Sequence, residues 1–268
     1  MTDKWALYQK ITKKYPRQKF LPKTVKWTNY TKLTKNKKYI IKPLDGSIGV
    51  GIKVIKGKDL PDERGRLKYI EDFQKEMLRK KFPNRSNEVI ISEYIPNLML
   101  FSGKIFHIRI YFIPSIINGK FAAYLTTFGK IITAASKFSK QNEYKTAVFD
   151  SHLQHNEKDL WFPDDLGVSA IKENKIFTQM VNILNKVATV FKDDFDNFPE
   201  ISNGFTILGT DFMIDKSCNV HLLEINSART GMKSLSEKFK LTFTKKMFAA
   251  IADLFLFPRE PRTAVKVL

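Results

Sequence analysis

The sequence predicts an α+β protein in which pairs of strands alternate with long helices. Three observations support this class. Short runs of β-branched and aromatic residues stand in pairs around turn residues, and two long stretches repeat apolar residues at helical spacing. In addition, 43% of the 268 residues are hydrophobic, which is enough for a sizeable core.

The first predicted elements are a hairpin, a helix and a buried strand. The hairpin joins residues 39–43 to residues 51–56 through a tip that contains glycines. The strand covers residues 88–94. Between them a helix begins near Pro61, because apolar residues follow at helical spacing: Leu67, Ile70, Phe73, Met77 and Leu78.

Strands are predicted for the middle of the chain. In residues 105–112 polar and apolar side chains alternate, so one face packs and the other is available for polar work. The polar face carries His107, Arg109 and Tyr111. Two more strands are predicted at residues 121–128 and 130–135.

The second half of the chain predicts a helix, a hairpin and a final helix. The hairpin spans residues 206–226 and the final helix residues 232–257. The first helix is indicated by Ile176, Met180, Ile183, Leu184, Val187 and Val190. In the final helix we expect aromatic residues near helical spacing to be core: Phe239, Phe243, Phe248, Phe255 and Phe257.

Composition limits where the protein acts and what it binds. The 46 Lys and Arg residues outnumber the 27 Asp and Glu residues, and the net charge of +19 implies an anionic partner. A lone cysteine, Cys218, excludes internal disulfides and cysteine-based zinc sites. Residues 1–20 lack the unbroken apolar stretch of a signal peptide, and the apolar run 247–257 is too short for a membrane span. We therefore expect a cytoplasmic protein without membrane association.

An acidic hairpin near the C-terminus is the most informative segment. A turn centred between Ser217 and Cys218 places Asp211 opposite Glu224, and Asn226 projects from the same face. Opposed carboxylates repel unless a positive group lies between them, and two carboxylates with an amide oxygen suit Mg²⁺. A solvated acidic edge is the alternative. The apolar neighbours in both strands favour the metal.

A second segment is suited to phosphate. Lys42 ends a strand, and the following residues 45–51 include three glycines, which let backbone N–H groups approach phosphate oxygens. Taken alone this signal is weak, because glycines at a hairpin tip are usually turn residues. Combined with the acidic hairpin, it indicates a site for a nucleotide and a metal ion.

The order of these segments resembles the ATP-grasp superfamily and, within it, the amino-acid ligases of the tubulin-tyrosine-ligase-like family. The resemblance implies two α+β lobes around a nucleotide cleft, divided here as residues 1–95 and 96–268. The matching segments are 20–24, 39–43, 47–52, 91–95, 106–109, 208–213 and 223–227.

Roles for individual residues follow from the resemblance. It implies that Mg²⁺ is held by Asp211, Glu224 and Asn226, with Asp211 also contacting ATP. Arg109 matches an arginine near the transferred phosphoryl group, so the implied catalytic set is Arg109, Lys42 and Asn226. The implied contacts of ATP are Lys42, Ser47, Gly49 and Gly51 at the phosphates, and Ser92, Glu93, Tyr94 and Ile95 at the adenine.

The resemblance further implies an ADP-forming reaction that joins a carboxylate to an amine through an acyl phosphate. The expected partners are a free amino acid and an acidic peptide or protein tail, of which a tubulin-like tail is one example. Departures from the family pattern at Ile48, His107 and Ile132 fall on the substrate side. The alternative is a nucleic-acid-binding or partner-recruiting protein on an ATP-binding scaffold, although no nucleic-acid-binding motif is present.

Overall fold

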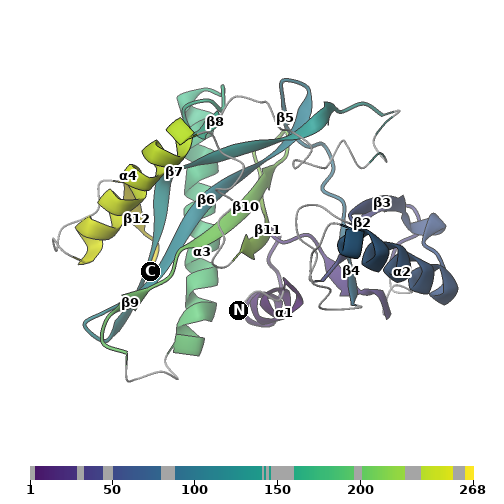
Figure 1. Ribbon diagram of the computed structural model, residues 1–268, viewed down its shortest axis with the longest axis horizontal. Helices are drawn as coiled ribbons and strands as arrows, with labels where there is room; N and C mark the ends of the chain where they lie inside the picture. Colours follow the sequence, from purple (N-terminus) through teal and green to yellow (C-terminus); the bar gives the residue numbers. More distant parts are fainter. Residues whose placement is uncertain are drawn as a thin grey trace.

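A computed structural model describes residues 4–28, 33–44, 51–79, 88–140, 142, 145, 160–195, 201–226, 237–255 and 263–268. The chain forms two antiparallel sheets (Figure 1), which confirms the predicted α+β class. The smaller sheet, with its helix α2, lies at one end of the molecule, and the larger sheet carries helices α3 and α4.

The small sheet has the strand order β1-β4-β2-β3. The predicted hairpin is confirmed as β2 (Lys38–Pro43) and β3 (Lys53–Lys56), and the predicted strand as β4 (Val89–Glu93); β1 (Thr24–Lys26) was not predicted. Tyr39 and Ile41 of β2 pack under α2 (Glu63–Arg79), so Lys42 points to the opposite face. A short 3-10 helix, η2 (Gly57–Asp59), precedes α2.

The predicted helix is confirmed as α2, but its apolar residues do not all face the sheet. Ile70 and Phe73 are each 6% exposed, as a core face requires. Leu67 and Leu78 are 49% and 68% exposed, because they lie on the side of the helix that does not meet the sheet.

The large sheet has the order β11-β10-β6-β7-β12, and three short strands attach to its middle. The two predicted strands at 121–128 and 130–135 are one continuous strand, β7. The main strands are β6 (Lys104–Ile117), β7 (Lys120–Lys137), β10 (Leu208–Ile214), β11 (Val220–Asn226) and β12 (Ala264–Lys266). The short strands are β5 (Leu100–Phe101), β8 (Leu160–Phe162) and β9 (Gly204–Phe205).

Helices cover both faces of the large sheet, whereas the alternation in β6 predicted one packed face and one face available for polar work. The long predicted helix is α3 (Ala170–Phe195), whose buried residues form the main core with Ile108 and Ile110. The final predicted helix is α4 (Glu237–Phe255), which packs on the opposite face against Tyr111.

The aromatic residues of α4 do not all belong to the core. Phe239 and Phe243 are each 3% exposed and pack on the sheet, as predicted. The prediction for Phe248 was wrong, because its side chain is 67% exposed on the outer face of the helix. Phe255 is half-buried, and Phe257 lies outside the described residues.

Helix α1 (Lys4–Lys14) was not predicted, because lysines interrupt its short apolar pattern. It lies beside β11, between the two sheets (Figure 1), and buries Leu7 and Ile11 in the core under the large sheet.

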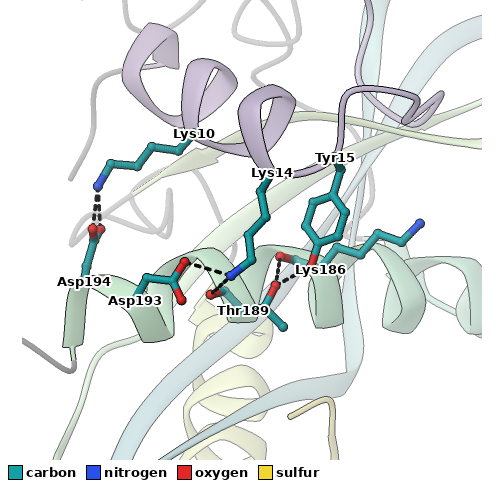
Figure 2. Close-up of polar contacts among 7 residues, drawn as sticks. All are labelled: Lys10, Lys14, Tyr15, Lys186, Thr189, Asp193 and Asp194. Atoms are coloured by element: carbon teal, nitrogen blue, oxygen red, sulfur yellow. Dashed lines mark hydrogen bonds and ion pairs between the residues drawn. The ribbon is translucent and has the colours of Figure 1, made fainter.

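Polar contacts hold the C-terminal half of α1 to α3 (Figure 2). Lys10 pairs with Asp194 at 2.5 Å, and Lys14 pairs with Asp193 at 2.7 Å and donates to the Thr189 carbonyl at 2.9 Å. These acidic residues belong to the last turn of α3, where the helix dipole disfavours negative charge, so the lysines compensate them.

The packing of α1 bears on how the lobes divide. The sheets separate after β4, near the boundary predicted at residue 95. Helix α1 comes from the first segment but packs in the core of the second, so the division at residue 95 stays a prediction. Within the described ranges, no helix combines the length and apolar character that crossing a bilayer requires.

Two phenylalanines of α4 give a matched test of how this helix packs on the large sheet. We expect Phe243→Ala to lower the free energy of unfolding by about 3–5 kcal/mol, since it leaves a cavity between α4 and the sheet. Phe248→Ala should change it by no more than about 0.5 kcal/mol, because the side chain is exposed. Urea unfolding followed by circular dichroism measures both, and equal losses would contradict the orientation of α4.

Candidate nucleotide and metal site

The acidic hairpin forms with the predicted pairing of its carboxylates. Asp211 in β10 lies opposite Glu224 in β11, and Gly209 lies opposite Asn226. The predicted turn centre was wrong, because the pairs nearer the turn are shifted by one residue, with Phe212 opposite Leu222. The register changes between Asp211 and Phe212 because β11 has one extra residue there, Leu223, and this β-bulge in β11 restores the predicted register at the carboxylates.

The bulge determines which way Glu224 points. Leu222 is buried in the core on the α3 side, and in a regular strand Glu224, two residues later, would point the same way. The extra residue at the bulge reverses this alternation, so Glu224 shares the face of Asp211 and Ile225 enters the core. Bulges commonly re-aim a side chain beside a functional site.

Hydrogen bonds connect the three predicted metal ligands. The Nδ2 atom of Asn226 donates to Glu224 Oε1 at 2.9 Å and to Asp211 Oδ2 at 3.2 Å. The trio therefore lies together on one face of the sheet, as the sequence predicted.

The chain itself supplies cations to the paired carboxylates. Arg109 in β6 forms a two-pronged contact with Asp211, at 2.7 Å from Nε and 2.6 Å from Nη2. Asp211 is 3% exposed, so this compensation is needed for folding. Lys4 of α1 lies 3.4 Å from Glu224. A metal ion is thus not the sole source of positive charge that the opposed carboxylates require.

Two pKa shifts reflect this charge balance. Burial alone would lower the pKa of Arg109, but the adjacent Asp211 raises it above its ordinary value. Burial would likewise raise the pKa of Glu224, yet Lys4, the Asn226 hydrogen bond, Lys42 and Arg109 together lower it to about 2. Both groups are therefore charged at neutral pH.

A row of chemically distinct side chains crosses the large sheet through Asp211 and Glu224. Register places Glu224, Asp211 and Arg109 side by side on β11, β10 and β6. The row continues through Lys130 of β7 to Trp161 of β8. At the next positions on the same face His107 lies opposite Ile132. Two of the residues that depart from the family pattern on the substrate side are therefore neighbours.

Lys42 approaches this row from the small sheet. One pocket at the junction of the sheets is lined by Lys42 and Ser92, by Lys4, and by Glu224 and its neighbours in β11. Burial lowers the pKa of Lys42 to about 8, an effect that Lys4 adds to and Glu224 opposes. The cavity measures about 40 Å³, far below the roughly 300–1,000 Å³ of ligand pockets.

The predicted adenine-binding residues occupy the end of β4 and the residues after it. The Ser92 hydroxyl lies 2.8 Å from that of Thr24, and Glu93 pairs with Lys37 at 2.9 Å. The amide of Tyr94 donates to the Lys38 carbonyl at 3.0 Å. Ile95 is buried in a small apolar cluster. Within this group, Ser92 lines the pocket described above.

Of the predicted phosphate loop, the structure describes Gly51, whereas Ser47, Ile48 and Gly49 lie outside the described residues. Gly51 has a φ of 78°, and its carbonyl accepts a hydrogen bond from the Tyr69 hydroxyl. A Cβ atom there would lie 2.8 Å from Pro43 and Phe73. Glycine is therefore required at this position for packing, whatever its role toward phosphate.

The donor set suits a magnesium ion. Asp211 and Glu224 offer carboxylate oxygens on one face, and rotation of the Asn226 amide would add a third oxygen. Arg109 would share Asp211 with the ion. Sequence reasoning missed Lys4, because the pairing with Glu224 depends on where α1 packs, which no local pattern indicates.

Comparison with known proteins gives concordant findings. The model of the tubulin-tyrosine ligase family matches residues 4–251. A probable tubulin–tyrosine ligase of Schizosaccharomyces pombe is 26% identical over 185 residues, which cover 63% of this chain. The chain spans 42% of the length of that relative.

A solved structure shares the fold. The C-terminal domain of K. lactis Pby1, an ATP-grasp enzyme interacting with the mRNA decapping enzyme Dcp2, matches with a TM-score of 0.65 and 20% identity. The match covers 98% of this chain and 76% of that one. The predicted ATP-grasp fold is thereby confirmed.

The pair between Arg109 and Asp211 can be tested by a double-mutant cycle. Arg109→Met should lower the free energy of unfolding by about 3–5 kcal/mol, because it leaves a buried carboxylate uncompensated. The double variant Arg109→Met/Asp211→Asn should recover part of that loss, as the remaining side chain is neutral. Urea unfolding measures each variant, and strict additivity of the two substitutions would contradict the pair.

Proposed function

Because the chain belongs to the tubulin-tyrosine ligase family and has an ATP-grasp fold, we propose that it is an ATP- and Mg²⁺-dependent carboxylate–amine ligase. In this reaction a carboxylate oxygen takes the γ-phosphoryl group of ATP, and ADP leaves. An amine then attacks the acyl carbon of the acyl phosphate, and inorganic phosphate leaves as the amide forms.

This chemistry requires no covalent nucleophile from the protein. A carboxylate is a poor acyl donor, and phosphorylation turns one of its oxygens into a good leaving group. The protein must align the reactants and neutralise charge on the transferred phosphoryl group. The site consists of cations and hydrogen-bonding groups held by two sheets, which is suited to that task.

One observation carries the proposal: cations and oxygen ligands from both lobes meet at the junction of the sheets. Lys42 from the small sheet and Lys4 from α1 line one pocket with Glu224. In the proposal the two lysines bind the phosphates of ATP. Arg109, fixed by Asp211, presents its remaining N–H groups to the reacting carboxylate or phosphoryl group.

In the proposal Asp211, Glu224 and Asn226 hold the magnesium ion. When bound, the ion neutralises charge on the β- and γ-phosphates. The low pKa of Glu224 keeps this ligand ionised across the physiological range. Before the ion binds, the Asn226 amide holds the two carboxylates together through its Nδ2 atom, and rotation of this amide would exchange those bonds for an oxygen ligand to the ion.

Nucleotide binding requires the lobes to separate. The cavity of about 40 Å³ between α1, the small sheet and β11 is too small for a nucleoside triphosphate. We infer that the small sheet moves away from β11 to admit ATP, while α1 stays with the large lobe, because its apolar residues and ion pairs join it to α3.

For substrates we propose a free amino acid and an acidic peptide or protein tail, with a tubulin-like tail as one example. The net charge of +19 and the row of Arg109 and Lys130 support an anionic acceptor. In such a reaction the cytoplasm supplies the ATP, and we propose it as the location.

A second candidate is a nucleic-acid-binding or partner-recruiting protein that binds ATP without ligating. The net charge favours it, as do Ile132 and His107 at positions where the family pattern has other residues. The two candidates are separated by the presence or absence of an amide product.

The ligase proposal is tested by Glu224→Gln. We expect wild-type protein, incubated with ATP, Mg²⁺, amino acids and an acidic peptide, to release ADP and to increase the peptide mass by one residue. The variant should lose at least about 99% of this activity, since one carboxylate of the metal site is gone. Mass spectrometry and an ADP assay measure both steps.

Glu88→Gln is the matched control, because this exposed carboxylate pairs with Lys26 and is not among the residues that line the pocket with Lys42 and Glu224. It should keep wild-type activity. If Glu224→Gln turned over ATP as fast as this control, the assignment of the site would be wrong.

The lowered pKa of the Lys42 amine predicts that nucleotide binding depends on pH. Its pKa of about 8 in the ligand-free protein means that the amine loses its positive charge as the pH rises from 7 to 9. Affinity for ATP should therefore fall about tenfold over this range, because the protonated fraction falls about tenfold. In Lys42→Arg the guanidinium stays charged, and the fall should disappear. Binding of a fluorescent ATP analogue measures both, and a flat wild-type profile would contradict this role.

A further inference from the structure

The outward face of α4 is apolar where a surface helix is usually polar. On this helix Leu241 is 58% exposed and Phe248 is 67% exposed. Ala249 is also exposed, and Ala252 is half-exposed on the same side. The opposite side, with Phe239 and Phe243, already packs on the large sheet. The helix therefore has two apolar faces, of which one is covered.

The apolar surface continues beyond the helix. Phe255 packs against Phe205 of β9 with the two rings tilted and their centroids 4.9 Å apart, and Phe205 is 46% exposed. We call the set Leu241, Phe248, Ala249, Ala252, Phe255 and Phe205 the α4 stripe. Exposed apolar side chains that share one face in this way often mark an interaction surface.

The large residues of the stripe recur every seven residues, the spacing with which one helix packs along another. Leu241, Phe248 and Phe255 are each seven residues apart, which brings them onto one line along α4. A second helix lying alongside would meet them with its own apolar residues at the same interval. A fluid lipid surface requires no such register.

Charge restricts the partner further. Lys238 and Lys245 flank the stripe, also seven residues apart, and both are exposed. Among the described side chains of α4 the single acidic group is Asp253, which is 4% exposed and cannot offset them on the surface. A partner helix with acidic residues beside its apolar face would pair with these lysines.

A second copy of this chain fits less well. A two-fold dimer places the same patch of each copy against the other, so the lysines of one α4 would face those of its partner. Each copy also carries a net charge of +19, which opposes association.

From these observations we propose that the α4 stripe binds an acidic amphipathic helix of another protein. Helix α4 and β9 lie at the opposite end of the molecule from the small sheet (Figure 1), so an occupant of the stripe would leave the junction of the lobes accessible. The proposal is independent of ligase activity, and its test requires no turnover.

The test uses two synthetic three-heptad peptides labelled with fluorescein. Both carry Leu at the a and d positions, and one has Glu at e and g where the other has Lys. Fluorescence anisotropy should show the wild-type protein binding the Glu peptide at least about tenfold more tightly than the Lys peptide. Lys238→Glu/Lys245→Glu should reverse the preference.

Phe248→Asp tests the apolar part of the stripe and should weaken binding of the Glu peptide by about tenfold or more. Ile171→Asp is the matched control, because Ile171 is 83% exposed on α3 and should be dispensable. Circular dichroism and the urea midpoint establish that each variant is folded, and Phe248→Ser provides a second variant with a neutral side chain.

Several results would overturn the proposal. These are absence of binding to the Glu peptide, equal affinity for the two peptides, or equal effects of Phe248→Asp and Ile171→Asp. A concentration-dependent dimer that Phe248→Asp abolishes in sedimentation would assign the stripe to a second copy. Loss of binding to phosphatidylserine–phosphatidylcholine vesicles in Phe248→Asp, without any peptide binding, would assign it to a membrane.

Discussion

The buried ion pair between Arg109 and Asp211 is the interaction on which the site depends. A carboxylate that is 3% exposed costs several kcal/mol unless it is compensated, so Asp211 can face Glu224 only because the adjacent strand supplies a guanidinium. Once the pair is in place, Asp211 receives the Asn226 amide, which also reaches Glu224. The positions of all three oxygen-bearing side chains therefore follow from the order β11-β10-β6 in one sheet.

The second constraint is that the site needs groups from three separate parts of the fold. The large sheet supplies the acidic trio and Arg109, the small sheet supplies Lys42, and α1 supplies Lys4. Against the effect of burial, Lys4, the Asn226 hydrogen bond, Lys42 and Arg109 lower the pKa of Glu224 to about 2. Burial, with a smaller contribution from Lys4, lowers the pKa of Lys42 to about 8. A polyanionic ligand would complete this charge balance. These groups are therefore suited to binding a phosphate chain.

Sequence patterns predicted those parts of the structure that depend on local order. The alternation in residues 105–112 correctly separated the core face of β6 from the face of Arg109, and the acidic hairpin gave the pairing of Asp211 with Glu224. The ATP-grasp fold was also predicted, from the order of short segments.

What the sequence could not predict depends on tertiary packing. Helix α1 has too few apolar residues to stand out, yet its docking on α3 brings Lys4 to Glu224. Phe248 comes five residues after Phe243 and so lies on another side of α4, and only the position of the sheet shows which of the two faces outward. The guanidinium beside Asp211 was assigned to substrate alone, because strand order is not encoded in any single segment.

The bulge in β11 implies that this hairpin tolerates changes of composition better than changes of length. Between the turn and the bulge, any residue compatible with a strand maintains the alternation of inward and outward positions. Loss or gain of one residue there would shift that alternation, directing the Glu224 carboxylate into the apolar core and Ile225 toward the junction of the lobes. A single-codon deletion in this stretch would therefore be more damaging than most substitutions in it.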